Sequence, residues 1–332
     1  YWVLKWALNS FADSNMRLYK KHAGDWLVLF FCFSLITGCS EPSSEQLDTS
    51  NNIDPEYIAG ETYYGRNAYT EYRPGDLPIV IGTPHGGSEK PEEIPDRTWG
   101  TTVKDAYTQE LARIFADSLK AITGKPPHLI VCRLHRTKLD ANRDLDEAAQ
   151  GNGHAGSAWS EYHGYIESAK DTVSKYFQGG LYIDIHGQSR RPRIELGYLL
   201  DAEDYALPDS ILNSEVYINK SSLKALAEFA AADFATILRG ENSIGSMLFA
   251  YDYPVVPCIG ISDPGTEGYF RGGYSTIRHG SRDGGTISAV QIELYKEGIR
   301  DTAENRAKFS GIYSRTVVLF FKEYYGLDLI TL

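Results

Sequence analysis

The sequence predicts an α/β fold: a single three-layer domain in which a mostly parallel or mixed β-sheet carries helices on both faces. Short apolar, β-branched runs alternate along the chain with longer segments whose apolar residues recur at helical spacing. This alternation is typical of strands that are joined by crossover helices. The 332 residues suffice for one large core, and no internal repeat indicates a solenoid or a propeller.

The expected elements of the first half are bounded by glycine and proline. They follow in the order strand 77–82, helix 105–122, strand 128–132, helix 145–150, helix 158–177 and strand 181–185. Gly82 ends the first strand, and the Gly124-Lys-Pro-Pro127 stretch stops the first helix. The stretch 133–152 between the second strand and the long helix is charged and loop-like apart from its short helix.

The second half continues the alternation with strand 193–200, helix 221–238, strand 255–261, strand 288–294 and helix 302–324. Ser221 and Gly240 supply start and stop signals for the helix between them. Alternating apolar and polar residues predict the strand at 288–294. The Gly-rich segment 265–285 is expected to be a binding loop or a lid.

The N-terminal region carries a predicted targeting signal. A basic stretch from Met16 precedes an apolar core at 26–36, which is too short to span a membrane. The core ends in Leu35-Ile-Thr-Gly-Cys39, which resembles a bacterial lipobox. We therefore expect upstream residues and a signal peptide at 1–38, lipid on Cys39, a polar tether at 39–55 and a folded domain at 56–332. The alternatives are a buried hairpin or a plain secreted protein.

This signal predicts a bacterial lipoprotein of the cell envelope, anchored in the outer membrane and facing the periplasm or the surface. The net charge of −11 and the pI near 5.3 argue against nucleic acid as a partner. With Cys39 lipidated, Cys132 and Cys258 form a disulfide in an oxidising compartment or remain buried free thiols. The oligomeric state is left open.

Two histidines follow strand ends in the same pattern. His85 lies in Pro84-His-Gly-Gly87 after the first strand, and His186 lies in Asp184-Ile-His-Gly187. The carboxyl ends of strands are where open α/β sheets bind ligands. A catalytic zinc ion takes three protein ligands and keeps one position for water. The pattern therefore predicts one Zn²⁺ ion held by His85 and His186.

The third zinc ligand is expected to be a carboxylate of the following loop. Glu89 is favoured because it is nearest to His85 in the sequence, and Asp96, in a turn stiffened by Pro95, is the alternative. Either carboxylate could instead be a solvated loop residue. Asp184 either points to the opposite face of its strand or orients a metal-bound histidine.

A cation-rich stretch at 132–143 stands out in an acidic protein. A guanidinium beside an amide suits a carboxylate, so Asn142 and Arg143 are predicted to clamp a substrate carboxylate. Arg133 or Arg136 is expected to stabilise an oxyanion at the metal. The alternative is a charged loop that makes surface ion pairs.

Glu293 lies in a predicted central strand between apolar neighbours. An unpaired carboxylate is costly to bury, so Glu293 is expected to have a function. Beside a zinc ion it would take a proton from water and return it to a leaving amine. The alternative is an outward-facing glutamate on a half-exposed strand.

Together these motifs resemble the N-formylglutamate amidohydrolase family over about residues 75–320. Four motifs occur in order: His85-Gly-Gly87, Leu139-Asp-Ala-Asn-Arg143, Asp184-Ile-His-Gly-Gln188 and Gln291-Ile-Glu293. Ala158-Trp159, Tyr162-His163 and Glu195-Leu-Gly-Tyr198 fit as well. The resemblance implies a fold related to zinc carboxypeptidases and hydrolysis of amides of acidic amino acids. It also implies zinc on His85 and His186, carboxylate recognition by Asn142 and Arg143, and Glu293 as general base.

The predicted function is a zinc-dependent amidohydrolase that cleaves a C–N bond of an N-acyl amino acid or peptide-like substrate bearing a carboxylate. One alternative is a carboxypeptidase-like enzyme or a hydrolase of γ-glutamyl or cell-wall peptides. Another is a non-catalytic surface protein that grips a ligand with the segment 265–285. The partners expected are a small acidic amide or peptide, and a membrane through the lipid anchor.

Overall fold

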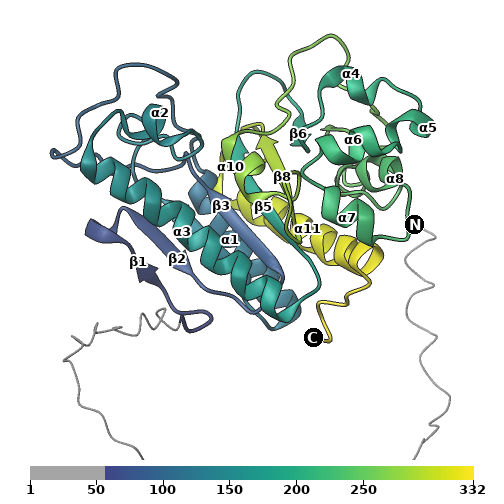
Figure 1. Cartoon of the computed structure of the whole chain (residues 1–332), viewed down its shortest axis with the longest axis horizontal. Helices are drawn as coiled ribbons and strands as arrows, with labels where there is room; N and C mark the ends of the chain where they lie inside the picture. Colours follow the sequence, from purple (N-terminus) through teal and green to yellow (C-terminus); the bar gives the residue numbers. More distant parts are fainter. Residues whose placement is uncertain (1–56) are drawn as a thin grey trace, which may run out of the picture. The chain divides into compact units, whose positions relative to one another are not determined.

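The computed structural model describes residues 57–332, in which eight strands form one mixed sheet (Figure 1). The strands are β1 (Tyr63–Tyr64), β2 (Thr70–Arg73), β3 (Ile79–Thr83), β4 (His128–Cys132), β5 (Gly180–Gly187), β6 (Ile194–Gly197), β7 (Val255–Val256) and β8 (Ile287–Leu294). Their spatial order is β1-β2-β4-β3-β5-β8-β6-β7. The central strands β4, β3, β5 and β8 are parallel, whereas β2 and β6 flank them antiparallel. Three strand ends, those of β3, β5 and β8, therefore lie side by side at one edge.

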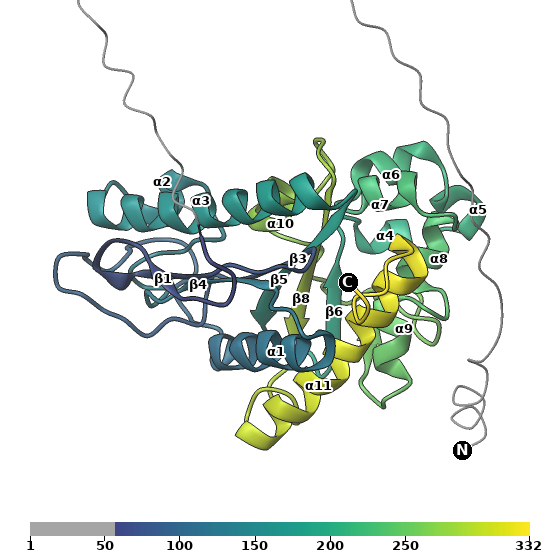
Figure 2. The same ribbon diagram turned by 90° about the horizontal axis from the view of Figure 1, so that it is seen from below.

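Helices cover both faces of this sheet (Figure 2). One face carries α2 (Leu145–Ala149), α3 (Gly153–Tyr176) and α10 (Tyr274–His279), and the other carries α1 (Thr108–Thr123) and α11 (Ala303–Phe320), which continues into a π-helical turn at Phe321–Tyr325. Short helices gather beside β6 and β7: α4 (Ala202–Tyr205), α5 (Asp209–Leu212), α6 (Glu215–Lys220), α7 (Lys224–Phe229), α8 (Phe234–Arg239) and α9 (Ile244–Phe249). A 3₁₀ turn at Arg66–Ala68 links β1 to β2. The predicted α/β fold class is confirmed.

Side-chain alternation along β5 fixes which residues face which layer. Leu181, Ile183 and Ile185 belong to the core under α1 and α11, whereas Tyr182 belongs to the core under α3. Each such fully buried aliphatic side chain contributes roughly 1.5–3 kcal/mol to folding. Because the period of a strand is two residues, His186 emerges on the same face as Tyr182.

Local signals set the ends of the long helices. The Asn152 side chain accepts a hydrogen bond from the Ala155 amide at 2.9 Å and so caps the start of α3. Gly124, with a left-handed φ of 77°, ends α1. The central strands and the helices predicted at 105–122, 145–150, 158–177 and 302–324 are present with shifted ends.

Three predictions in the second half are wrong in detail. The single helix expected at 221–238 is two helices, α7 and α8, because the chain is extended at Ala230 and at Asp233, and each helix buries its own apolar side chains. The strand expected at 255–261 stops at Val256, since Pro257 has no amide donor for the ladder and a turn follows. The segment expected as a loop at 265–285 contains α10.

The predicted signal peptide, the lipidation at Cys39 and the tether at 39–55 lie outside the described residues. Within residues 57–332, no helix has the length and apolarity needed to cross a membrane. Cys132 and Cys258 are both free and buried.

Candidate metal centre

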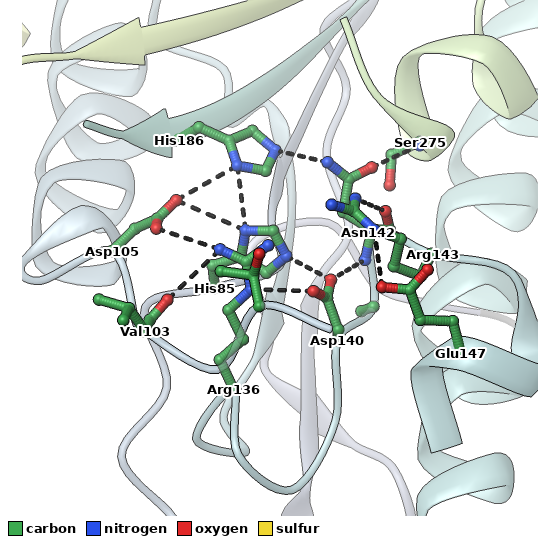
Figure 3. Close-up of polar contacts among 12 residues, drawn as sticks. His85, Val103, Asp105, Arg136, Asp140, Asn142, Arg143, Glu147, His186 and Ser275 are labelled. Carbon is green, nitrogen blue, oxygen red and sulfur yellow. Dashed lines mark hydrogen bonds and ion pairs between the residues drawn. The ribbon is translucent and has the colours of Figure 1, made fainter. Parts of the chain in front are cut away.

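The two strand-end histidines meet at the edge of the sheet. His85 follows β3, His186 is the last residue but one of β5, and these strands are hydrogen-bonded neighbours. Both side chains are about 2–3% exposed, and their Nδ1 atoms are 3.1 Å apart. Figure 3 shows the two rings pointing toward one another.

Asp105 completes the group from the loop before α1. Its Oδ2 atom lies 3.2 Å from His186 Nδ1 and 3.5 Å from His85 Nδ1. The Asp105 amide donates to the His85 carbonyl at 3.0 Å, and the Gly187 amide donates to Asp105 Oδ2 at 3.0 Å. These bonds fix the carboxylate against both histidine segments. Among the residues that the structure describes, this is the group of three whose side chains could hold a metal ion.

The three ligand atoms fit a single divalent ion. In tetrahedral zinc with bonds of about 2.0–2.1 Å, neighbouring ligand atoms are roughly 3.3–3.4 Å apart. The three separations here are 3.1, 3.2 and 3.5 Å. The electrostatics agree: burial opposes protonation of His186, but the carboxylates of Asp184 and Asp105 raise its pKa well above the usual range. The site therefore favours a positive charge between its ligands.

Two further aspartates hold the histidine rings in place. His85 Nε2 lies 2.6 Å from Asp140 Oδ1, and His186 Nε2 lies 3.1 Å from Asp184 Oδ2; both aspartates are fully buried. For His85, donation from Nε2 to Asp140 leaves the Nδ1 lone pair directed at the centre, as metal-binding histidines require. Of the two orientations considered for Asp184, the one toward His186 is correct.

Glu293 lies beside this centre on β8. It is the register partner of His186 across β5 and β8, and it is 6% exposed. Gln291 Nε2 donates to Glu293 Oε1 at 3.0 Å. Burial raises the pKa of Glu293 to about 7; His186 opposes this rise, and Asp105 and Asp184 add to it. Glu293 is therefore a buried group poised near neutral pH, and the outward-facing alternative does not apply.

The two carboxylates expected as third ligand lie elsewhere. Glu89 forms an isolated β-bridge with Leu134, and its 53% exposed side chain pairs with Arg133 at 3.1 Å. Asp96 is 60% exposed and pairs with Lys138 at 2.9 Å. The structure brings neither to the histidines and brings Asp105 instead. The helix predicted at 105–122 includes Asp105, whereas α1 begins at Thr108 and leaves Asp105 in the loop before it.

The Asn142–Arg143 pair lies at the rim of the centre. Asn142 Oδ1 accepts from the Ser275 amide at 2.7 Å, which turns its Nδ2 toward His186 Nε2 at 3.2 Å. Arg143 uses Nε on Glu147 at 3.2 Å and Nη1 on the Asn142 carbonyl at 2.7 Å. Its Nη2 makes no hydrogen bond to a described residue, so the N–H groups of Nη2 remain available to bind a ligand.

Of the two arginines proposed for oxyanion stabilisation, only Arg136 lines the cavity over the centre. Arg136 Nε donates to Asp140 Oδ2 at 2.9 Å, and its Nη1 is 3.7 Å from Asp105 Oδ1. Arg133 is turned away: it donates to the Ala68 carbonyl at 2.7 Å and pairs with Glu89.

The cavity over the centre has a volume of about 730 Å³. Its lining is rich in basic side chains, which are Lys104, Arg136, Arg143, Arg190, Arg271, Lys296 and Arg300. Asp105 and Glu293 are its acidic lining residues. In a chain with a net charge of −11, this local excess of cations favours a negatively charged ligand.

No family model and no curated protein matches this chain. Several solved structures have a similar fold. The fold is similar to that of an N-formylglutamate amidohydrolase from Ralstonia eutropha JMP134, at 14% identity and a TM-score of 0.43, with 76% of this chain and 95% of that one covered. It is also similar to a bacteriophage poly-γ-glutamate hydrolase (13% identity, TM-score 0.36, coverage 78% and 90%) and to a metallo-carboxypeptidase from Burkholderia cenocepacia (10%, 0.36, coverage 76% and 61%). At these values a likeness assigns no activity, so the function depends on the side chains of the site.

Proposed function

We propose that this protein is a metal-dependent hydrolase, with Zn²⁺ as its metal, that cleaves an amide bond in a substrate bearing a carboxylate. One observation carries the proposal. Two histidine Nδ1 atoms and an aspartate Oδ2 converge within 3.1–3.5 Å under a cavity that also holds Glu293.

The chain's own residues supply the rest of the chemistry. When bound, a zinc ion polarises a carbonyl and makes water a better nucleophile near neutral pH. Glu293, held by Gln291, takes a proton from the attacking water and passes it to the departing amine nitrogen. Arg136 faces the cavity with a buried guanidinium and stabilises the oxyanion that develops on the substrate carbonyl.

The basic side chains that line the cavity can bind a substrate carboxylate. Arg143 offers its Nη2, and charge-assisted hydrogen bonds to carboxylates are stronger than neutral ones. Lys104, Arg190 and Lys296 also line the cavity and form no ion pair with a described carboxylate. N-acyl acidic amino acids and γ-glutamyl peptides are therefore the substrate classes that we propose.

The test is a panel of amides with and without a chelator. Release of amine is measured from N-acyl-glutamates, γ-glutamyl peptides and matched neutral amides. The proposal predicts release that stops after zinc removal, returns on zinc addition and is lost in His186→Ala. His154, an exposed histidine outside the cavity lining, supplies the control variant His154→Ala, which should keep full activity. Zinc binding without release from any amide would favour a binding protein instead.

We propose separately that a lipid on Cys39 anchors the enzyme in the cell envelope. The support is the lipobox-like Leu35-Ile-Thr-Gly-Cys39 after an apolar core. Cys39→Ser should move the protein from the membrane fraction to the soluble fraction without loss of activity. An unchanged membrane fraction would contradict the anchor.

A further inference from the structure

Arg300 is a buried cation that makes no ion pair with a described carboxylate. It lies between β8 and α11 and is 3% exposed. Its Nε donates to the Leu294 carbonyl at 3.1 Å, its Nη2 donates to the Gln188 carbonyl at 3.0 Å, and its Nη1 donates to the Ala106 carbonyl. A buried guanidinium whose hydrogen bonds all go to backbone carbonyls joins the backbone segments that carry them, because each bond fixes a main-chain atom.

These three carbonyls belong to the segments that carry the site. Ala106 directly follows Asp105, Leu294 directly follows Glu293, and Gln188 comes two residues after His186. The three segments are far apart in the sequence: Ala106 is in the loop before α1, Gln188 directly follows β5, and Leu294 is the last residue of β8. One guanidinium thus joins the backbones beside the proposed metal ligand of the loop, the proposed metal ligand of β5 and the proposed base of β8.

Gly187 is the residue that lets this guanidinium approach. A Cβ atom at position 187 would lie 2.5 Å from Arg300 Cζ and 2.6 Å from its Nη1. Any side chain there would push the guanidinium away from its carbonyls. This contact explains why glycine follows His186: the position needs the absence of a side chain.

We propose that Arg300 is a positioning residue that sets the spacing of Asp105, His186 and Glu293 by joining the backbone next to each of them. The inference rests on the proposed metal-dependent function, because its effect is on how tightly the site binds its ion. Asp105 and His186 reach the 3.2 Å contact between their ligand atoms only if the loop before α1 and the end of β5 hold their mutual position. Arg300 bonds to both segments, through the carbonyls of Ala106 and Gln188.

Arg239 provides a matched control. It too is a guanidinium that donates to backbone carbonyls, those of Tyr205, Leu207 and Ser262, and unlike Arg300 it also pairs with a carboxylate, that of Asp209. It lies among the short helices beside β6 and outside the cavity lining. Replacing either arginine with methionine keeps an unbranched apolar stem that reaches to about the position of Nε, and it removes the donors of the guanidinium. Both variants should lose stability, and only the one at position 300 should lose metal affinity.

The experiment measures the Zn²⁺ dissociation constant by competition with a chromophoric chelator for wild type, Arg300→Met and Arg239→Met. Loss of groups that support metal ligands costs about 10–100-fold in metal affinity. We expect a loss of this size in Arg300→Met and less than about threefold in Arg239→Met. Added guanidinium ions should restore part of the affinity of Arg300→Ala, since the cavity left by truncation can hold them.

Gly187→Ala keeps Arg300 and displaces it, so it covers the case in which Arg300→Met does not fold. It should weaken zinc binding to a similar degree. If the wild type binds Zn²⁺ and a folded variant at position 300 or 187 binds it equally tightly, the inference about Arg300 is wrong. The proposed metal centre is not affected by that result. Absence of zinc binding by wild type overturns the metal centre, and the inference falls with it.

Discussion

Asp140→Asn tests how His85 is prepared for a metal ion. The Asp140 carboxylate is fully buried and serves three donors: His85 Nε2 at 2.6 Å, the Asn142 amide at 3.1 Å and Arg136 Nε at 2.9 Å. Burial opposes ionisation of Asp140, but the contact with His85 and the nearby guanidinium groups of Arg136 and Arg143 hold its pKa far below the usual range. An asparagine of the same shape has one acceptor oxygen and a donating amide group. It cannot satisfy all three donors.

Each orientation of the new amide has a distinct cost. If its NH₂ group faces His85, the ring must carry its proton on Nδ1, which blocks the metal-binding lone pair. If its NH₂ group faces Arg136, a buried guanidinium N–H loses its acceptor. The first outcome weakens zinc binding by about 10–100-fold, or roughly 1.4–2.8 kcal/mol. The second lowers the free energy of unfolding by about 1–3 kcal/mol.

The assay measures two quantities on the same protein: the Zn²⁺ dissociation constant by chelator competition, and the free energy of unfolding of the zinc-free form in urea. Asp204→Asn is the control, because Asp204 is a buried carboxylate that pairs with Lys220 at 2.6 Å in the distant α4. It should lose stability and keep its zinc affinity. If Asp140→Asn binds zinc as tightly as wild type and is equally stable, the proposed role of Asp140 is refuted.

Three further predictions concern the base, the clamp and pH. Glu293→Gln should lower kcat by about 10²–10⁴-fold with zinc affinity within about threefold of wild type, and an unchanged kcat would remove Glu293 from the mechanism. Arg143→Ala should raise KM for carboxylate-bearing amides far more than for neutral amides, and equal effects on both would argue against a clamp. Burial raises the pKa of Glu293 from 4.5 to about 7, so the folded zinc-free protein favours the protonated side chain. The stability that Glu293 contributes is therefore fully present below pH 4.5 and is lost as the pH rises through 7. Urea unfolding should therefore show Glu293→Gln gaining stability relative to wild type between pH 4.5 and 7, and a constant difference would contradict the raised pKa.

The sequence could predict the residues that stand at strand ends. His85, His186 and Glu293 follow apolar runs, and the carboxyl ends of neighbouring parallel strands meet at one edge of a sheet. Their proximity therefore follows from the α/β pattern once the strand order places β3, β5 and β8 side by side. The same reasoning places Asp184 with His186, since residues two apart share a face of a strand.

The third carboxylate could not be predicted in this way. Nearness in the sequence favours Glu89, but backbone pairing with 133–135 turns its side chain to solvent. Asp105 reaches the histidines because its amide bonds to the His85 carbonyl across twenty residues of loop. Arg300 was missed for a similar reason, because its partners are backbone carbonyls and leave no pattern in the sequence.

The structure gives a physical role to Trp159 and His163, which the family resemblance alone indicates in the sequence. Trp159 Nε1 donates to the Arg143 carbonyl at 2.9 Å, and His163 Nε2 donates to the Ala141 carbonyl at 3.0 Å. Both side chains come from α3 and fix the loop that presents Asn142 and Arg143. The short helices α4, α5, α6 and α9 escaped prediction because runs of four to six residues are too short to show a helical period.

The central claim is that Asp105, rather than Glu89, is the carboxylate that binds the metal ion with His85 and His186. The measurement that tests it most directly is the Zn²⁺ dissociation constant of Asp105→Asn beside that of Glu89→Gln. Loss of a ligand should cost more than the roughly 100-fold that supporting groups cost. The account predicts such a loss for Asp105→Asn and wild-type affinity for Glu89→Gln. The opposite result, or wild-type affinity in both variants, would contradict it.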